Sequence, residues 1–341
     1  MTTALISPSE LEALVVAALV ACNTSEANAR SVARALAQAE IDGQKGHGLS
    51  RVPSYGAQAK AGKVDGHATP EVRQMRPSAL MVDAKHGFAF PAFDLGIAQL
   101  PAMARANGVA AAGFVRSHHF GVAGRHVERL AKAGLVALAF GNTPQAIAPW
   151  GGQRPLFGTS PIAFAAPMGK GPPLVIDMAL SQVARGKILT AAQKGEAIPE
   201  DWAVDEEGRP TTDAKAALKG ALQPIGGAKG AALAMMVEVL AVSLTGANFG
   251  FEASSFFDAD GPPPGVGQFL IAIDPVAFSG GDVFAARMAV LASKIEGNGG
   301  ARLPGSRRIA MRERAKRDGL TVDAKLLEEV RTLGGKHSII G

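Results

Sequence analysis

From about residue 80 onward, short runs of apolar, strand-forming residues alternate with longer segments of helical periodicity. This alternation is the strongest constraint on the fold, because it is typical of chains in which helices pack against a sheet. It predicts an α/β core with a mixed sheet. The expected strands cover residues 79–82, 109–115, 135–140, 162–166, 174–176 and 269–273, and the expected helices cover residues 92–106, 122–133, 182–194 and 229–244.

Helical patterns also occupy both ends of the chain. Ser7, Pro8 and Glu10 form a capping-box pattern at the start of a first helix, and a second helix is expected over residues 25–41. The C-terminal segments are again helical in pattern, and their polarity indicates an outer layer that folds back on the protein. They cover residues 282–296 and 307–333.

Composition excludes several classes of protein. Of the 341 residues, 47% are hydrophobic and 19% are charged, which is typical of a globular chain rather than a disordered one. The formal net charge of +5 comes from dispersed residues and aromatic residues make up 5%, so nucleic acid is disfavoured as a partner. Cys22 is the only cysteine, which excludes an internal disulfide and Cys-rich metal sites and fits a reducing compartment.

Targeting and membrane signals are also missing from the sequence. The N-terminus lacks the basic start and apolar run of a signal peptide. The most apolar helical stretch, residues 231–244, is interrupted by Glu238 and is too short to cross a bilayer. We therefore expect a soluble, cytoplasmic protein with no membrane partner.

Several common catalytic and nucleotide-binding motifs are missing as well. None of the 41 glycines belongs to a G-x-G-x-x-G hexamer, which disfavours a Rossmann domain. The sequence contains no Walker-type lysine loop, no G-x-S-x-G and no H-E-x-x-H. Nucleoside triphosphatase, serine hydrolase and zinc protease functions therefore lose their main support.

A first cluster of functional residue types, G-H-G-L-S-R, occupies residues 46–51. Histidine is the usual proton donor near neutral pH, and the flanking glycines leave room for a ligand beside His47. Arg51 can bind a carboxylate through two parallel hydrogen bonds. A surface loop without function is the alternative for this segment taken alone.

A second cluster, S-H-H-F-G, covers residues 117–121 between an expected strand and an expected helix. Ligands often bind at such loops because the amides of the helix N-terminus point outward there. Adjacent side chains diverge, and no acidic or cysteine partner lies at ligand spacing, so a metal site is disfavoured. We expect nucleotide contact or catalysis from this loop.

Three further clusters combine small, hydroxyl and basic residues. Residues 156–161 (L-F-G-T-S-P) and 177–181 (D-M-A-L-S) can bond a ligand or simply cap helices. Residues 226–230 (G-G-A-K-G) open a helix and can hold a phosphate. Residues 302–308 (R-L-P-G-S-R-R) suit a phosphate, including the 2′-phosphate of NADP, or form an ordinary solvated helix start.

Taken in order, these clusters resemble one family, the type-2 malate/L-lactate dehydrogenases, also called sulfolactate-dehydrogenase-like oxidoreductases. The resemblance extends over roughly residues 8–335 and includes H-G-x-x-R, S-H-H-F, P-L-F-G-T-S-P-I-A-F, D-M-A-x-S, G-G-x-K-G and R-L-P-G-x-R. It implies a homodimer and a three-layer, non-Rossmann fold that binds NAD(P). We expect an N-terminal helical unit with the catalytic loop (residues 1–75) packed with residues 280–341, and an NAD(P)-binding core (residues 76–279).

The resemblance also implies roles for individual residues. His47 is the implied proton donor and Arg51 the implied ligand of the substrate carboxylate. Further substrate contacts are implied for Thr159, Arg185 and Gly186. The implied cofactor-binding residues are His119, Phe120, Gly121, Val122, Ala123, Asp177, Met178, Ala179, Lys229, Arg302, Leu303, Pro304, Gly305, Ser306 and Arg307.

Within the family, S-H-H-F and residues 244–252 are most similar to the Δ1-piperideine-2-carboxylate/Δ1-pyrroline-2-carboxylate reductases. We therefore expect reduction of a cyclic imino acid to L-proline or L-pipecolate, with NADPH favoured by the arginines of residues 302–308 and NADH as the second candidate. Gly46 stands where the family commonly has serine. Arg185 and Lys187 instead resemble the hydroxyacid dehydrogenases.

Two other hypotheses remain open at this point. The first is an NAD(P)-dependent 2-hydroxyacid dehydrogenase of the malate, L-lactate or sulfolactate type. The second is a non-enzymatic protein that binds nucleic acid through residues 302–316. Turnover of 2-oxo acids against cyclic imines separates the two enzymatic hypotheses, and a cofactor titration separates both of them from the third.

Overall fold

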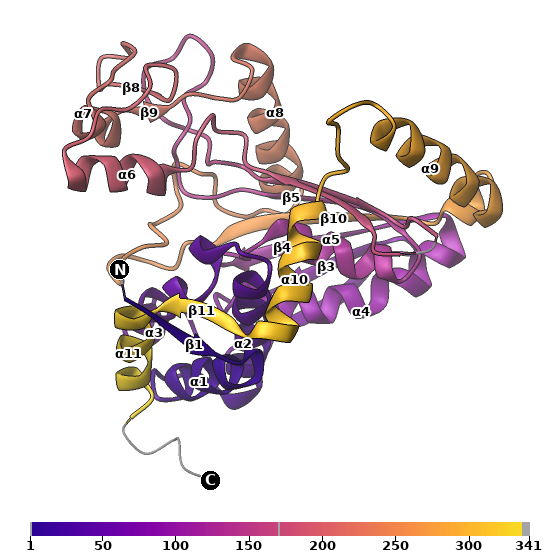
Figure 1. Ribbon diagram of the computed structural model, residues 1–341, viewed down its shortest axis with the longest axis horizontal. Coiled ribbons are helices and arrows are strands. Elements are labelled where there is room, and N and C mark those ends of the chain that lie inside the picture. Colours follow the sequence, from indigo (N-terminus) through magenta and orange to yellow (C-terminus); the bar gives the residue numbers. More distant parts are fainter. Residues whose placement is uncertain (1, 170, 336–341) are drawn as a thin grey trace.

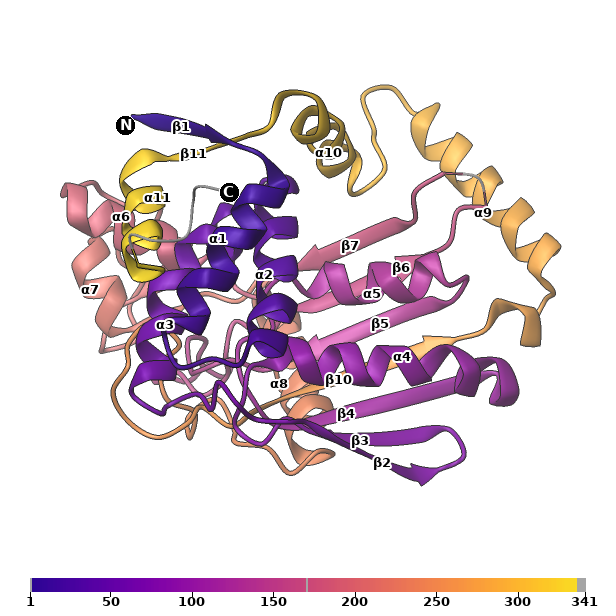
Figure 2. The ribbon, with the colours of Figure 1, turned by 90° about the horizontal axis from the view of Figure 1, so that it is seen from below.

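The computed structural model describes residues 2–169 and 171–335, and its centre is a seven-stranded sheet (Figures 1 and 2). In the sheet, β3 and β4 are parallel, and the other neighbouring strands are antiparallel. The expected α/β class with a mixed sheet is therefore confirmed. In spatial order the strands are β2 (Glu71–Arg76), β3 (Ala79–Asp83), β4 (Val109–Ser117), β10 (Val266–Ile273), β5 (Val136–Gly141), β6 (Ile162–Ala166) and β7 (Leu174–Met178).

One face of the sheet packs against α4 (Ala89–Asn107) and α5 (Ala123–Lys132), which run alongside the strands in Figure 2. Small residues of the strands line this face: Ala112 of β4 and Ala139 of β5 are fully buried. Small side chains allow the helices to approach the sheet closely, and Leu130 of α5 belongs to the same buried cluster. This core fixes the strand ends from which several loops of the site begin.

The other face is covered near one end by a small lobe. The lobe contains α6 (Arg185–Lys194), α7 (Ala214–Lys219), α8 (Ala228–Glu238), a π-helical turn η3 (Val239–Ser243), and the short strands β8 (Ala203–Val204) and β9 (Ala221–Leu222). The helix expected over residues 229–244 is thus split. Strand β10 passes so close to the π-helical turn that a methyl group on Gly267 would lie 1.8 Å from the carbonyl oxygen of Ala241.

An N-terminal helical bundle lies beside the sheet. It contains α1 (Pro8–Val20), α2 (Glu26–Ile41) and α3 (Val52–Lys60), and two 3-10 turns, η1 (Lys45–His47) and η2 (Leu49–Arg51), connect α2 to α3. The capping box at the start of α1 is confirmed, with hydrogen bonds in both directions between Ser7 and Glu10. Buried residues of the bundle form one cluster with residues from α10, β11 and α11.

The C-terminal segment differs from the expected helices at one point. Residues 307–333 form α10 (Ser306–Asp318), the strand β11 (Leu320–Asp323) and α11 (Ala324–Leu333) rather than helix throughout. Strand β11 pairs with β1 (Thr3–Ile6), a long-range contact that no local pattern reveals. Leu320 and Val322 alternate with exposed Thr321, so the strand periodicity is present but lasts only four residues.

Helix α9 (Gly281–Glu296) extends away from the rest of the protein in both views (Figures 1 and 2). None of its residues is buried within the part of the chain that the structure describes. The helix appears where the pattern predicted one, but it does not cover the N-terminal bundle. No helix of the described residues is long and apolar enough to cross a membrane.

Candidate active site

A cavity of about 520 Å³ lies where the N-terminal bundle, the strand ends and the small lobe meet. Seven residues predicted from the sequence line it, and they come from four separate parts of the chain: His47, Arg51, His119, Thr159, Ala179, Arg185 and Gly186. The same cavity is lined by Ser181, from the cluster at residues 177–181, and by residues that the sequence did not single out: Thr143, Pro144, Gln145, Ala146, Ala184, Ala253, Ser255, Phe256 and Phe257. The structure therefore brings the candidate proton donor and the substrate residues together.

The loop that carries His47 is held from behind by Glu40 at the end of α2. The buried Glu40 carboxylate accepts a hydrogen bond of 2.7 Å from the backbone N–H of Leu49. It lies so close to the loop that a methyl group on Gly48 would be 2.3 Å from Oε1 of Glu40. A side chain at residue 48 would therefore have to displace the Glu40 carboxylate, whereas nothing lies within 4 Å of a methyl group built on Gly46.

His47 is stacked on His119, with ring centroids 5.2 Å apart and an interplanar angle of 11°. Burial and the neighbouring Arg51 guanidinium lower the pKa of His47 to about 4. Its Nδ1 atom is buried and has no hydrogen-bond partner among the described residues. His47 is therefore a neutral imidazole at pH 7, able to accept a proton.

His119 is oriented by the buried side chain of Tyr55 in α3. The Tyr55 hydroxyl lies 2.5 Å from Nδ1 of His119. Burial raises the pKa of Tyr55 well above its usual value and lowers that of His119 well below its own, so both side chains are neutral. A neutral tyrosine donates to Nδ1, which places the ring proton of His119 on Nε2. Tyr55 was not selected from the sequence, although it is the only tyrosine in the chain.

His118 diverges from His119, as expected for adjacent side chains. Nε2 of His118 lies 2.8 Å from Oε1 of Gln58 and donates to it. Burial, followed by the charges of Arg51 and Lys63, lowers the pKa of His118 to about 3. His118 is therefore a neutral residue of the interior, and the structure places no other histidine, cysteine, aspartate or glutamate around it in a metal-binding cluster within the described residues.

Two arginines face the cavity and have no acidic partner among the residues that the structure describes. Arg51 donates from Nε to the carbonyl of Gly46 at 2.8 Å, and its guanidinium lies 5.0 Å from the centre of the Phe257 ring. Arg185 donates from Nη2 to the carbonyl of Leu218 at 2.8 Å. None of the residues that line the cavity is acidic, so its formal charge is positive. An uncompensated positive cavity attracts an anionic ligand.

Thr159 is positioned by a neighbouring loop. Its backbone N–H donates to Oγ1 of Thr143 at 2.9 Å. The two segments touch, because a methyl group on Gly158 would lie 2.4 Å from the carbonyl oxygen of Thr143. Thr143 and Thr159 therefore form one hydroxyl-bearing wall of the cavity.

The predicted cofactor residues lie in two further groups. In the first, the loop 119–123 and the end of β7 meet, since the backbone N–H of Gly124 donates to Oδ2 of Asp177 at 2.7 Å. Burial raises the pKa of Asp177, and the hydrogen bond from Gly124 and the nearby Arg308 act in the opposite direction. The side chains of Phe120, Val122 and Ala123 are buried in the interior, so this loop presents mainly its backbone.

The second group lies at the start of α10. Residues 301–304 and Ser306 line a cavity of about 910 Å³ together with residues of α9 and β7. A methyl group on Gly305 would lie 3.5 Å from the carbonyl oxygen of Val175 in β7. The segment 305–308 is thus a neighbour of Asp177 and of the loop 119–123, and Met178 beside it is exposed.

Lys229 is not brought to either group. It lies in the first turn of α8, and the preceding Gly226 and Gly227 line a separate shallow cavity with Glu200 and Asp201. Two carboxylates beside the glycine turn disfavour an anion there. The structure gives no contact between Lys229 and the other predicted cofactor residues within the described part of the chain.

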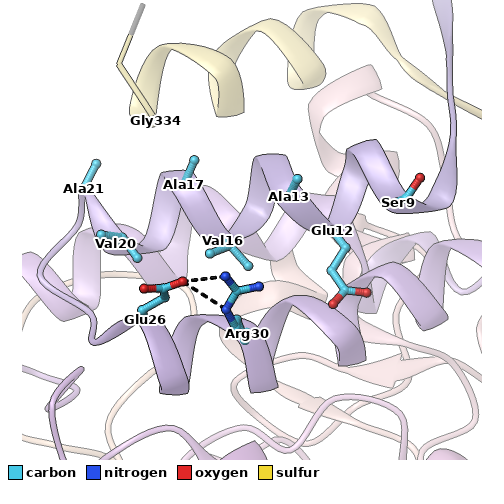
Figure 3. Close-up of a pocket in the computed structure, with 10 residues that line it drawn as sticks. All are labelled: Ser9, Glu12, Ala13, Val16, Ala17, Val20, Ala21, Glu26, Arg30 and Gly334. Carbon is cyan, nitrogen blue, oxygen red and sulfur yellow. Dashed lines mark hydrogen bonds and ion pairs between the residues drawn. The ribbon is translucent and has the colours of Figure 1, made fainter. Parts of the chain in front are cut away.

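One further cavity, of about 740 Å³, lies between α1, α2 and the end of α11 (Figure 3). Alanines and valines of α1 form part of its lining, and its one arginine, Arg30, is paired with Glu26 at 2.5 Å. No histidine lines it. By contrast, the cavity of His47 contains histidines that can exchange a proton and arginines that can bind a carboxylate.

Comparison with known proteins identifies close relatives. Residues 6–331 match the family model described as malate/L-lactate dehydrogenase. The chain is 50% identical over 327 residues to the (2R)-3-sulfolactate dehydrogenase (NADP(+)) of Chromohalobacter salexigens, covering 96% of this chain and 97% of that protein. It is 42% identical over 332 residues to the Δ1-pyrroline-2-carboxylate/Δ1-piperideine-2-carboxylate reductase of Pseudomonas putida, covering 96% of each chain.

A solved structure has the same fold. The crystal structure of Δ1-piperideine-2-carboxylate reductase from Pseudomonas syringae pv. tomato matches with a TM-score of 0.91 and 40% sequence identity, covering 97% of this chain and 99% of that one. The predicted non-Rossmann fold type is thereby confirmed. The family resemblance inferred from the ordered motifs is confirmed as well.

Proposed function

The chain belongs to the malate/L-lactate dehydrogenase family and is an oxidoreductase, and on that premise we propose that it transfers a hydride between NADPH and the carbon beside the carboxylate of a small acid. The observation that carries the proposal is the cavity in which Arg51, Arg185 and the stacked pair of His47 and His119 meet. It provides an anion site and a proton-accepting group within one enclosure.

The residues present fit a phosphate-bearing dinucleotide. Helix α10 begins without a side-chain cap, so its first backbone N–H groups are available to an anion. Arg302 and Arg307 are exposed and have no acidic partner among the described residues. These residues would hold the phosphates, including a 2′-phosphate, while the loop 119–123 and Ala179 would hold the rest of the cofactor. The sulfolactate relative, which is named for NADP(+), supports the same choice.

When bound, NADPH supplies the hydride, and the residues of this chain orient the acceptor and manage the proton. Arg51 binds the carboxylate next to the reacting carbon and fixes its orientation. In the oxidative direction, neutral His47 accepts the proton of the substrate hydroxyl. In the reductive direction a bound anion offsets the charge of Arg51, raises the pKa of His47 and allows it to carry the proton that it donates.

The pair of unpaired arginines favours a substrate with two anionic groups. We place the carboxylate beside the reacting carbon on Arg51 and a second carboxylate or a sulfonate on Arg185. A 2-hydroxy or 2-oxo acid of the malate or sulfolactate class meets this requirement, and the 50% identity to a sulfolactate dehydrogenase supports it.

Reduction of a cyclic imino acid is the second candidate. It is supported by the 42% identity to a Δ1-pyrroline-2-carboxylate/Δ1-piperideine-2-carboxylate reductase and by the match to the piperideine-2-carboxylate reductase structure. Phe256 and Phe257 give the cavity a flat apolar wall that suits a ring. A monoanionic ring, however, leaves one of the two arginines without a partner.

Steady-state turnover with NADPH tests the proposal. We expect higher kcat/KM for sulfopyruvate or oxaloacetate than for pyruvate, Δ1-pyrroline-2-carboxylate or Δ1-piperideine-2-carboxylate. Higher kcat/KM for a cyclic imine would reject the dianionic substrate in favour of the second candidate. No turnover of any member of the panel, combined with no fluorescence change on NADPH titration, would reject the enzymatic proposal itself.

The arginine substitutions sharpen that test. A charge-assisted hydrogen bond contributes about 1.5–3 kcal/mol, so Arg185→Gln should raise KM for the dianionic substrate about tenfold to one-hundredfold. The same change should leave KM for a monoanionic substrate within about twofold, whereas Arg51→Gln should raise KM for both kinds. Lys187→Gln is the control, because Lys187 lies over the Trp202 ring outside the cavity.

A further inference from the structure

The buried carboxyl group of Glu238 lies behind the threonine wall of the cavity. Glu238 is the last residue of α8 and precedes the π-helical turn that packs against β10. The residue is 4% exposed. Within the described residues no lysine, arginine or histidine pairs with it, so it is a buried acid without a compensating cation. A group of this kind is costly to bury as a charge and is stable when it is neutral.

Glu238 touches three segments that also form the cavity. Its Oε2 accepts long hydrogen bonds of 3.4 Å from Nδ2 of Asn142 and from the backbone N–H of Gly250. Asn142 precedes Thr143, and the carbonyl of Gly250 accepts a hydrogen bond of 2.8 Å from the N–H of Gln145. One side of the carboxyl group is therefore surrounded by donors.

The other side is surrounded by acceptors. Oε1 of Glu238 is buried and has no hydrogen-bond partner among the described residues. A methyl group built on Gly250 would lie 2.8 Å from the carbonyl oxygen of Leu156, 3.0 Å from that of Thr143 and 3.1 Å from Oε1. Three oxygens thus surround the same small space beside Gly250. A carboxylate on this space repels the two carbonyls, whereas a protonated carboxyl group brings a hydrogen-bond donor to it.

We propose that Glu238 is a positioning residue that is protonated in the active enzyme and bridges the Thr143 and Leu156 segments through an Oε1–H donor. The bridge holds Thr143 against Gly158, and Thr143 in turn bonds the N–H of Thr159. Because both threonines line the cavity, loss of the proton loosens the wall against which the substrate binds. This inference rests on the proposed function, because one of its tests measures KM for the substrate.

The ionisation of Glu238 is consistent with this arrangement. Burial raises the pKa of Glu238 to about 7 against the opposing hydrogen bonds from Gly250, Gly158 and Asn142, and the charge of Glu252 raises it further. Residues 142–145, 156–159 and β10 carry no ionisable side chain, so Glu252 is the one charged group on the segments that pack around Glu238. The proton is therefore lost as the pH rises through about 7.

The test compares Glu238→Gln with the wild-type enzyme across pH. Glutamine stays neutral, can accept from Gly250 through its oxygen and can donate to a carbonyl through its amide. In the wild-type enzyme KM should rise about tenfold between pH 6 and pH 9 with little change in kcat. In Glu238→Gln, KM should change by no more than about twofold over the same pH range. Glu238→Leu should raise KM at every pH, because it lacks both hydrogen-bonding functions. Equal pH profiles for the wild-type and Gln enzymes would overturn the proposal.

A second readout does not depend on turnover. Unfolded glutamate ionises near pH 4.3 and folded Glu238 near 7, so ionisation destabilises the folded wild-type protein as the pH rises between these values. The Tm of Glu238→Gln relative to wild type should therefore increase from pH 5 to pH 7.5 and then stay constant. Glu252→Gln removes the neighbouring negative charge, which raises the pKa of Glu238. Both the rise in KM and the change in Tm should therefore occur at lower pH in this variant. A pH-independent Tm difference would contradict a protonated Glu238 even if the enzyme turned over none of the tested substrates.

Discussion

At the scale of single residues, the cavity combines one imidazole that can accept a proton with a second that is held in a fixed tautomer. His47 has an unpartnered Nδ1, whereas Nδ1 of His119 is engaged by Tyr55. The low pKa of His47 arises from burial first and from Arg51 second. The same arginine that we propose as the ligand of the substrate carboxylate thus adds to the effect of burial in keeping His47 neutral.

Replacing His47 should separate chemistry from binding. We expect His47→Ala to lower kcat about 10²-fold to 10⁴-fold, because a positioned acid–base group contributes an effect of this size. The fluorescence titration of NADPH should be unchanged within about twofold. His67→Gln is the matched control, since His67 is exposed and lies outside the cavity. If His47→Ala keeps more than a tenth of the wild-type kcat, another group handles the proton.

At the scale of elements, the 3-10 turns between α2 and α3 decide where His47 and Arg51 point. From the sequence, both glycines that flank the histidine were interpreted as room for a ligand. The structure gives a different reason for Gly48, because the carboxylate of Glu40 occupies the space that a side chain there would need. Glycine at this position is therefore a packing requirement rather than room for a ligand.

Alanine at Gly48 should displace the Glu40 carboxylate and break its hydrogen bond to Leu49. Loss of that bond and the added crowding should destabilise the protein by about 1–3 kcal/mol and lower kcat. Urea unfolding and steady-state kinetics measure the two effects. Gly46→Ala and Gly46→Ser should be tolerated, because the space around Gly46 is open. Equal effects at Gly46 and Gly48 would refute the packing argument.

Several basic residues at and after the start of α10 have acidic partners, so they do not form the exposed basic stripe that nucleic-acid binding requires. A stripe of arginines over residues 302–316 was one alternative for binding nucleic acid. In the structure, Arg308 lies near Asp42, Lys316 pairs with Glu313, and Arg314 lies near Asp318. Much of the positive charge is therefore compensated within the protein, and Arg302 and Arg307 are left for a smaller anion.

At the scale of the whole molecule, Arg312 connects three regions of the chain. Its guanidinium donates to both oxygens of Asp42 at the end of α2, at 2.6 and 2.7 Å. It also donates to both oxygens of Glu128 in α5, at 2.5 and 2.7 Å. Burial alone would raise the pKa of Glu128, but the hydrogen bonds and charge of Arg312 outweigh it and lower the pKa to about 2.

Arg312→Met should remove the main partner of two buried carboxylates, leaving Lys132 at 3.3 Å from Glu128 and Arg308 at 3.8 Å from Asp42, and destabilise the protein by up to about 3–5 kcal/mol at pH 7. The pKa of Glu128 in the folded protein lies below its unfolded value, so its stabilising contribution is present above about pH 4.3 and is lost as the pH falls toward 2. The difference between Arg312→Met and wild type should therefore shrink at acid pH.

Urea unfolding at pH 7 and at about pH 3, between the folded and unfolded pKa values of Glu128, measures this effect. Arg314→Gln is the control, because its side chain is 77% exposed and its contact with Asp318 is 3.9 Å long. Surface ion pairs contribute about 0–1 kcal/mol, so this change should have little effect on stability. Similar losses for Arg312 and Arg314 would show that the three regions are not joined through Arg312.

The sequence by itself determined the α/β class, most strands of the sheet, the two N-terminal helices and the residue types of the site. These features depend on residues that are only a few positions apart in the sequence. Apolar periodicity, helix caps and glycine turns are all local patterns of this kind. The four-residue pair of β1 and β11 was missed because its partners lie at opposite ends of the chain. Periodicity over four residues is too short to identify a strand without its partner.

Only the tertiary structure decided which loops share a cavity. It brought Arg51 and Arg185 together, left Lys229 apart, and placed Tyr55 and Glu238 behind the reacting groups. Glu238 is the clearest example, since in the sequence it only interrupts an apolar helix. Its ionisation depends on burial and on hydrogen bonds from three distant segments, which contain Asn142, Gly158 and Gly250, and these are properties of packing that no local sequence pattern encodes.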